Sequence, residues 1–212
     1  GRMPEPALRA AFDGLARRLD RDHDPQWHPL LLGPDDPRAE AEAFVAAIYR
    51  ERFGATLHEF MPWLLGFADA TGALRAVVGL RPARGRALFV EQYLDAPAER
   101  AVSVALGRVV SRDALIEVGS LAALRPGDAR RLILGLTRGL HEAGQRWVLF
   151  TATRQLRNAF ARMGLQPTSL GPARPTRLHA AATDWGRYYD ADPELLCGDI
   201  AAGAAYLDVA SK

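Results

Sequence analysis

Two glutamates stand inside apolar segments of the sequence, where a carboxylate is costly. Glu91 lies in LFVEQYL, residues 88–94, and Glu117 lies in LIEVGSLAA, residues 115–123. Burial in a strand raises the pKa of a carboxyl group, and a carboxylate with a raised pKa suits a general base that deprotonates an amine. The alternative is a structural ion pair with a core-facing arginine such as Arg81. The sequence alone leaves both interpretations open.

A turn and a helix follow the second of these segments. The turn RPGD begins at Arg125, and Asp128 is expected to cap a helix that runs from Ala129. Backbone N–H groups at a helix N-terminus bind phosphate, and Arg125, Arg130 and Arg131 flank this one. The alternative is that Asp128 satisfies the N–H groups itself and that the arginines form a solvated face.

Polar side chains also lie at the end of the next apolar segment, residues 146–153, and just after it. Thr151 and Thr153 share one face of the strand predicted there, because side chains alternate with period two. Asn158 falls at the start of the predicted following helix. It could donate a hydrogen bond to a ligand or simply cap a turn.

The elements that must position these residues follow from hydrophobic periodicity and turn signals. Helices are predicted over residues 4–20, 39–53 and 98–110 and from 129 to 144. Strands are predicted over 62–68 and 74–80 as a hairpin, then over 88–94, 115–123, 146–153 and 176–183, with loops at 21–38 and 166–175. The helix between 115–123 and 146–153 makes those two strands parallel. The expected fold is therefore an α+β sandwich with a mixed, mostly antiparallel sheet around a central parallel βαβ unit, preceded by an N-terminal helix and connector over residues 1–38.

Composition excludes several classes of function. The 212 residues carry a net charge of only +2, which gives no support to nucleic-acid binding. Cys197 is the single cysteine, and His23 and His28 lie among prolines, so we expect no metal site. No apolar run reaches the ~18 residues of a membrane span, and no signal-peptide core precedes the first helix, so we expect a cytoplasmic protein without stable membrane insertion. Nucleotide-binding, serine-hydrolase and zinc-protease motifs are also missing.

Motifs spread over most of the sequence resemble the thermostable hemolysin family. They run in the same order from about residue 49 to residue 198, and their joint occurrence makes the resemblance specific. They are YRERFGA at Tyr49, VVGLRPA at Val77, LFVEQYLD at Leu88, IEVGSLA at Ile116, FTAT with LRN from Phe150, and WGRYYD at Trp185.

That family is similar to the GNAT acyltransferase superfamily and to acyl-homoserine-lactone synthases. The resemblance implies a GNAT-like domain over residues 39–212, with a sheet splayed between two central parallel strands that admits an acyl thioester. Backbone N–H groups around Ser120, Leu121 and Ala122 would hold the thioester carbonyl. Tyr93, Thr151 and Asn158 would shape the acceptor and donor sites.

The donor's phosphate would lie at the turn after residues 115–123. The superfamily's loop is usually [QR]-x-x-G-x-[GA], whereas Arg125, Gly127 and Ala129 form a loop that is one residue shorter and contains Asp128. The donor is therefore either an acyl-CoA or an acyl-phosphopantetheine on a carrier protein, whose acidic helix would meet arginines such as Arg130.

The sequence thus predicts an N-acyltransferase that moves an acyl group from a pantetheine thioester to an amine of a small molecule. Glu91 or Glu117 would be the base, directly or through a water. Two other functions stay open: a membrane-active haemolysin, for which the helix over residues 4–20 is the only candidate element, and a non-catalytic GNAT-like module that binds a carrier protein.

Overall fold

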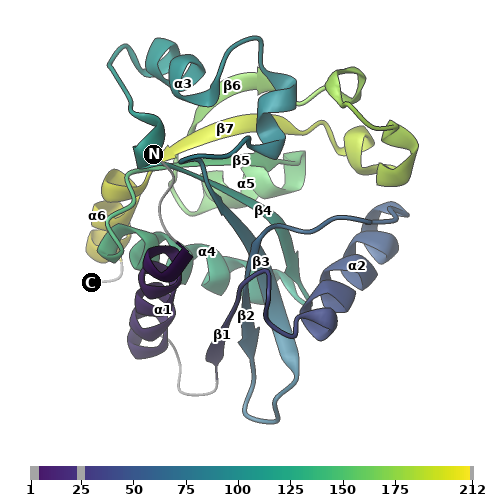
Figure 1. Ribbon diagram of the computed structural model, residues 1–212, viewed down its shortest axis with the longest axis vertical. Helices are drawn as coiled ribbons and strands as arrows, with labels where there is room; N and C mark the ends of the chain where they lie inside the picture. Colours follow the sequence, from purple (N-terminus) through teal and green to yellow (C-terminus); the bar gives the residue numbers. More distant parts are fainter. Residues whose placement is uncertain (1–4, 23–26, 211–212) are drawn as a thin grey trace.

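The computed structural model describes residues 5–22 and 27–210, and it contains one seven-stranded sheet with helices on both faces (Figure 1). The strands are β1 (His28–Leu32), β2 (Trp63–Ala68), β3 (Leu74–Pro82), β4 (Leu115–Ala123), β5 (Trp147–Ala152), β6 (Thr168–Pro172) and β7 (Glu194–Asp199). The α-helices are α1 (Glu5–Asp22), α2 (Ala39–Phe53), α3 (Ala98–Leu106), α4 (Pro126–Glu142), α5 (Arg154–Arg162) and α6 (Ile200–Ala210). Short 3₁₀ helices include η1 (Phe89–Tyr93), η3 (Pro175–Arg177), η4 (Ala182–Trp185) and η5 (Tyr188–Ala191).

The strand order is β1-β2-β3-β4-β5-β7-β6. Every neighbouring pair is antiparallel except β4 and β5, which are parallel and are joined through α4. A parallel pair needs a crossover of a dozen or more residues, and α4 supplies it. The predicted mixed sheet with a central βαβ unit is confirmed.

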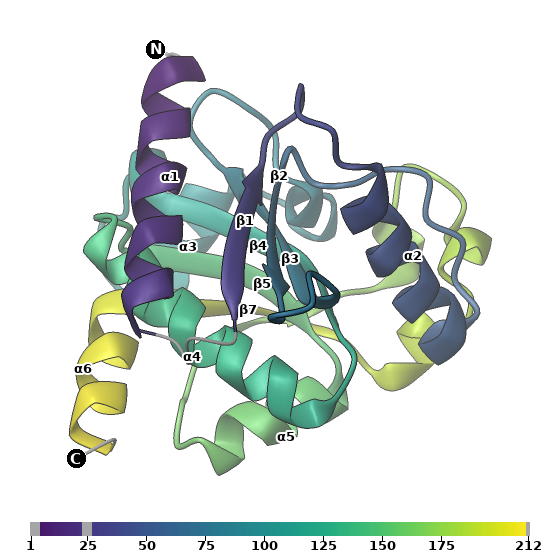
Figure 2. The same ribbon diagram turned by 90° about the horizontal axis from the view of Figure 1, so that it is seen from below.

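The two faces of the sheet carry different helices (Figures 1 and 2). α1, α4, α5 and α6 cover one face, where a single apolar core includes Phe12, Ile116, Leu132 and Ile200. The opposite face carries α2 on one side and η1 with α3 on the other. Its core is divided accordingly into one cluster beneath α2 and a second beneath η1 and α3, and these do not merge. Polar residues on this face of the sheet can therefore lie between the two apolar clusters.

Most predicted elements are present, and the hairpin turn is built as expected. The Asp69 carboxylate accepts hydrogen bonds from the N–H groups of Thr71 (2.9 Å) and Ala73 (3.2 Å), which closes the turn between β2 and β3. The chain ends α3 at Leu106, earlier than predicted, because Gly107 adopts a left-handed conformation with φ of 66°.

Other predictions at the sheet edges were wrong. The segment predicted as a connector over residues 21–38 contains the edge strand β1, although His23 lies outside the described residues. The strand predicted over 176–183 is absent, and the chain there forms 3₁₀ turns instead. The outer strand is β6, within the segment 166–175 predicted as a loop. Proline is tolerated on such an edge strand because no neighbour needs its missing N–H group, and this weakens the sequence signal.

The first helix contributes to the same core as the sheet. Leu8, Phe12 and Leu15 of α1 are buried against the face of the sheet that α4 covers. The segment predicted over residues 1–38 therefore contributes a helix packed on the sheet, α1, and a strand of the sheet itself, β1. Within residues 5–22 and 27–210, no helix combines the length and the apolar character needed to cross a membrane.

Candidate active site

The parallel strands β4 and β5 separate after a short paired stretch. Their register joins Leu115 with Trp147, Ile116 with Val148 and Glu117 with Leu149, but β4 continues to Ala123. Beyond Glu117 the sheet is therefore open between its two central strands. This is the splay that the family resemblance implied.

A bulge in β4 lies directly beside this opening. β3 advances from Val77 to Gly79 while β4 advances from Ala122 to Gly119, so β4 holds one extra residue. Ser120 accommodates it with a φ of 52°, a left-handed conformation that costs a non-glycine residue about 1 kcal/mol. Bulges re-aim backbone groups and are frequent next to active sites. The predicted carbonyl-binding residues Ser120, Leu121 and Ala122 are thus at or just after the bulge.

Glu117 is the buried carboxylate of this opening, with 1% of its surface exposed. Its Oε1 accepts hydrogen bonds from Arg81 Nη1 (3.0 Å) and from the N–H of Phe89 (3.2 Å). Its Oε2 accepts one from the N–H of Val90 (2.8 Å). Burial raises the pKa of Glu117 above its usual value, against the opposing effects of Arg81 and the two N–H groups.

A count of lone pairs shows what Glu117 can still do. A carboxylate has about four acceptor positions, and the three hydrogen bonds to Glu117 leave one of them open on Oε2. The ion pair with Arg81, one of the two interpretations that the sequence left open, is present. It leaves one acceptor position of the same carboxylate for a proton from an amine or a water.

Glu91 has a different environment from the predicted one. It lies on the 3₁₀ helix η1 and not on a strand, so that prediction was wrong. Its Oε1 accepts from Leu88 N (2.8 Å) and Arg112 Nη2 (2.7 Å), and its Oε2 accepts from Ala98 N (2.9 Å) and Arg112 Nη1 (2.8 Å). The bidentate Arg112 guanidinium is the main cause that lowers the pKa of Glu91 to about 2. All four acceptor positions are filled, which makes Glu91 an anchor for η1.

Arg112 is a residue that the sequence reasoning missed. It also pairs with Glu99 (2.8 Å) and donates to the carbonyl oxygens of Ala83 (2.8 Å) and Arg86 (2.6 Å). One guanidinium thus joins η1, α3 and the end of β3. No local pattern marks it, because its partners are distant in sequence.

Three tyrosines and Thr151 form hydrogen-bonded pairs in the neighbourhood of Glu117, whose charge acts on Tyr93. The hydroxyl groups of Tyr93 and Tyr189 are 2.6 Å apart, and Tyr188 donates to Thr151 Oγ1 (3.2 Å). Burial is the main cause that raises the pKa of Tyr93, Tyr188 and Tyr189 above the usual range, Tyr189 to about 12. The hydroxyls are therefore neutral at physiological pH and can donate hydrogen bonds.

The long connection between β6 and β7, residues 173–193, closes this side of the site; we call it the strap. His179 N donates to Gln92 Oε1 (2.9 Å) beside η1, and Thr56 N donates to the carbonyl of Asp184 (2.7 Å) just after α2. The ring centroid of Trp185, in the strap, lies 5.8 Å from that of Phe89 in η1 and 6.5 Å from that of Tyr49 in α2. The strap therefore bridges the interval between the two apolar clusters.

The helix N-terminus after β4 differs from the prediction. Arg125 and not Asp128 is the N-cap residue, and α4 begins at Pro126. The Asp128 carboxylate is buried and pairs with Arg75 Nη2 (3.1 Å) of β3, so it does not cap the helix. The N–H groups of Asp128 and Ala129 both donate to the Arg125 carbonyl, at 3.0 and 3.2 Å.

The exposed part of this turn is consequently small and basic. Arg125, Gly127 and Arg130 are exposed, and neither arginine forms an ion pair with another residue of the described chain. Arg131 faces the other way, with its guanidinium 4.1 Å from the Trp27 ring. Pro126 has no N–H group, which leaves fewer donors for a phosphate than a usual helix N-terminus offers.

Two residues of α5 complete the list of predicted positions. Asn158 is exposed and stands in the middle of α5, so its predicted place at the start of the helix was wrong; Thr153 caps the helix and accepts from Leu156 N (3.3 Å). Arg157 donates to the Ala152 carbonyl (2.8 Å) at the end of β5 and pairs with Glu194 (2.8 Å) of β7. It holds the β5 side of the opening in place.

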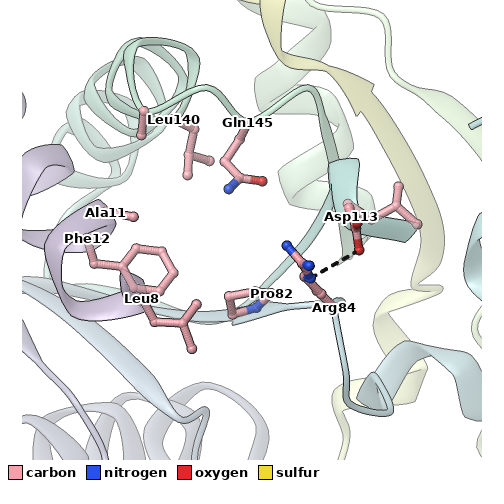
Figure 3. Close-up of a pocket in the computed structure, with 10 residues that line it drawn as sticks. Leu8, Ala11, Phe12, Pro82, Arg84, Asp113, Leu140 and Gln145 are labelled. Carbon is pink, nitrogen blue, oxygen red and sulfur yellow. Dashed lines mark ion pairs between the residues drawn. The ribbon is translucent and has the colours of Figure 1, made fainter. Parts of the chain in front are cut away.

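Figure 3 shows a small cavity that other residues line. It has a volume of about 60 Å³ and lies near the start of β4, between α1 and the end of α4, with Phe12, Leu115 and Leu140 among its lining residues. None of the predicted site residues lines it. Within the described residues, no group of three or more His, Cys, Asp or Glu side chains is placed to hold a metal ion.

Comparison with known proteins now adds to this geometry. A family model for thermostable hemolysin matches residues 33–204, most of the chain. The chain belongs to the thermostable hemolysin family. The resemblance inferred from its motifs is thereby confirmed, whereas no curated protein matches the chain.

Solved structures share the fold of this hemolysin-family chain at low identity. FeeM, an N-acyl amino acid synthase from uncultured soil microbes, has a TM-score of 0.61 at 13% identity, over 85% of this chain and 94% of FeeM. The AHL synthase LasI has a TM-score of 0.54 at 12% identity, over 82% and 90% of the two chains. A protein from Lactobacillus plantarum described as an N-acetyltransferase has a TM-score of 0.52 at 11% identity, over 82% and 99%. The fold is therefore GNAT-like, as predicted.

Proposed function

We propose that this chain is an N-acyltransferase that moves an acyl group from a pantetheine thioester to an amine of a small molecule. The observation that carries the proposal is the buried Glu117, with one open acceptor position, beside the opening between β4 and β5. The neighbours named as an N-acyl amino acid synthase and an AHL synthase support this class of reaction, because they share the fold that contains the opening.

Glu117 is the base in this proposal. The amine nitrogen attacks the thioester carbonyl, a C–N bond forms, the C–S bond breaks, and the sulfur leaves as a thiolate that takes up the proton lost by the amine. The amine must lose a proton, which Glu117 takes directly or through one water, since its pKa is raised and Oε2 can accept a further hydrogen bond. Glu91 is the weaker candidate, because its pKa is about 2 and its four acceptor positions are filled.

The remaining roles follow from position. Backbone N–H groups at the bulge, around Ser120 and Leu121, stabilise the oxyanion of the tetrahedral intermediate. Tyr93 of η1 and Thr151 of β5 orient the acceptor or the leaving thiol. The exposed Arg125 and Arg130 meet the donor's phosphate, which is on a carrier protein or on coenzyme A.

The structure supports a donor with few phosphate contacts at this turn. Pro126 contributes no N–H group, and the Asp128 carboxylate is withdrawn to Arg75, so its charge does not face a ligand. A single phosphopantetheine phosphate needs fewer donors than the pyrophosphate of coenzyme A. This favours an acyl carrier protein as the donor.

The test is release of free thiol from acyl-CoA and acyl-carrier-protein panels, with and without added amines. We expect amine-dependent thiol release and a decrease of about 10²–10⁴-fold in Glu117→Gln. A chain that binds the thioesters but never releases thiol would be a carrier-binding module instead. Equal rates in wild type and Glu117→Gln would remove Glu117 as the base.

A further inference from the structure

A pair of glycines leaves a bare strip of backbone next to Glu117. Gly79 of β3 and Gly119 of β4 are register partners, so neither strand carries a side chain at this position. Two positions further along the same register, Arg81 pairs with Glu117. Side chains two residues apart on a strand share a face and are about 6.6–6.8 Å apart, so the strip lies on the face of Glu117, one step further along β4.

Met61 lies across this strip. A Cβ atom on Gly79 would stand 2.3 Å from Met61 Cγ and 2.6 Å from Met61 Cβ. A Cβ atom on Gly119 would stand 2.8 Å from Met61 Cε, and apart from chain neighbours no other heavy atom of the described residues would be within 4 Å. The space directly above Gly119 is thus filled by the end of one flexible side chain.

The backbone of Met61 is fixed, while its side chain can adapt. Arg38 Nη2 donates to the Met61 carbonyl (2.5 Å), and Arg38 Nη1 donates to that of Pro62 (2.8 Å). The Met61 side chain is buried in the apolar cluster beneath α2, which also contains Leu64 and Val77. An unbranched thioether with three rotatable bonds changes its conformation at low cost.

From this arrangement we propose that the strip at Gly119 holds the alkyl chain of the transferred acyl group, and that Met61, which fills the space over Gly79 and reaches Gly119 with its Cε, determines the length of that chain. The inference rests on the proposed acyltransferase function. The strip begins at the bulge residue Ser120, where the thioester carbonyl is placed, and it leads into an apolar cluster. A straight methylene chain fits where no Cβ projects, and the Met61 side chain already lies there as an unbranched chain.

Met61→Ala removes about three chain atoms from the end of the strip. Each buried methylene strengthens binding about 4-fold, so a donor longer by about three carbons should gain up to ~60-fold in affinity and in kcat/KM. Met61→Leu keeps the volume and should keep the wild-type preference. Met163→Ala is the matched control, because Met163 is equally buried (8% exposed, against 7% for Met61) but lies at the end of α5.

The experiment measures binding of S-alkyl-CoA and S-alkyl-pantetheine thioethers, from ethyl to dodecyl, and transfer from the matching thioesters. We expect Met61→Ala to bind and transfer longer chains than wild type, with Met61→Leu and Met163→Ala unchanged. Gly119→Ala is a second variant, which places a methyl group against Met61 and should shorten the accepted chain even if Met61→Ala does not fold.

The outcomes separate this inference from the proposed function. An unchanged chain-length profile in Met61→Ala and Gly119→Ala, with transfer intact in wild type, overturns the chain site and leaves the acyltransferase. Shifted thioether binding without transfer from any donor supports the chain site and overturns the enzyme. No binding of wild type or Met61→Ala to these thioethers at any length, or to carrier proteins loaded with the same S-alkyl-phosphopantetheines, overturns both.

Discussion

Replacing Glu91 by glutamine tests the view that this carboxylate anchors η1. Glutamine keeps the shape but loses the charge that four donors now meet: two nitrogens of Arg112 and the N–H groups of Leu88 and Ala98. One of the two oxygens becomes an NH₂ group that faces donors, so hydrogen bonds are lost and a guanidinium is left partly unpaired. We therefore expect a destabilised protein.

The size of the effect follows from the pKa of Glu91. A decrease from 4.5 to about 2 corresponds to about 3 kcal/mol of stability near neutral pH. The side chain is 18% exposed, and solvent screening reduces this to about 2 kcal/mol. In a chain of this length, that is a decrease in Tm of about 4–8 °C.

The pH dependence gives the sign of the effect. A carboxyl group with a lowered folded-state pKa stabilises the protein fully above its unfolded-state pKa, and the stabilisation disappears as the pH falls through the folded-state value. Urea unfolding of wild type and Glu91→Gln should therefore differ by about 2 kcal/mol at pH 7. The difference should shrink between about pH 4.5 and about pH 2.

Glu99→Gln is the control for this prediction. Glu99 pairs with the same Arg112 through a single contact of 2.8 Å, and its side chain is 32% exposed. We expect a loss below about 1 kcal/mol there. A Glu91→Gln protein as stable as Glu99→Gln, or a difference from wild type that does not change with pH, would refute the anchoring role.

Three further predictions concern the opening and the strap. Ser120→Gly should stabilise the protein by about 0.5 kcal/mol in urea unfolding, because it relieves the left-handed φ of 52°; a loss would contradict the bulge geometry. Gly186→Ala should lower Tm by several degrees, since its Cβ would stand 2.2 Å from the Phe53 carbonyl oxygen; an unchanged Tm would show that the strap is not held there. kcat/KM should rise with pH through the raised pKa of Glu117, and a flat profile would argue against it as base.

Local patterns predicted the centre of the fold. The apolar runs that became β4 and β5, with a helix of amphipathic periodicity between them, fix a parallel pair by length alone. Glu117 could be singled out because one charge in such a run needs a partner. Its partner Arg81 could also be named from the sequence, because it directly follows the strand predicted over residues 74–80.

Contacts between segments that are distant in the chain could not be predicted from the sequence. The run containing Glu91 is too short for periodicity to separate a strand from a 3₁₀ helix, and the Arg112 side chain that decides its role is 21 residues away. Asp128 resembles an N-cap by type and position, but Arg75, 53 residues away, holds its carboxylate. Met61 lies over Gly79 and Gly119 only because β3 and β4 pair in one register.

The most direct test of the central claim is hydrogen exchange with and without an S-alkyl-CoA thioether analogue or an analogue-loaded carrier protein. If the donor enters between β4 and β5, amides over residues 119–123 and in the first turn of α4 should exchange more slowly in the complex, while β1 and β6 should not change. Protection confined to another part of the chain, or none in residues 119–129 with ligand bound, would contradict the account.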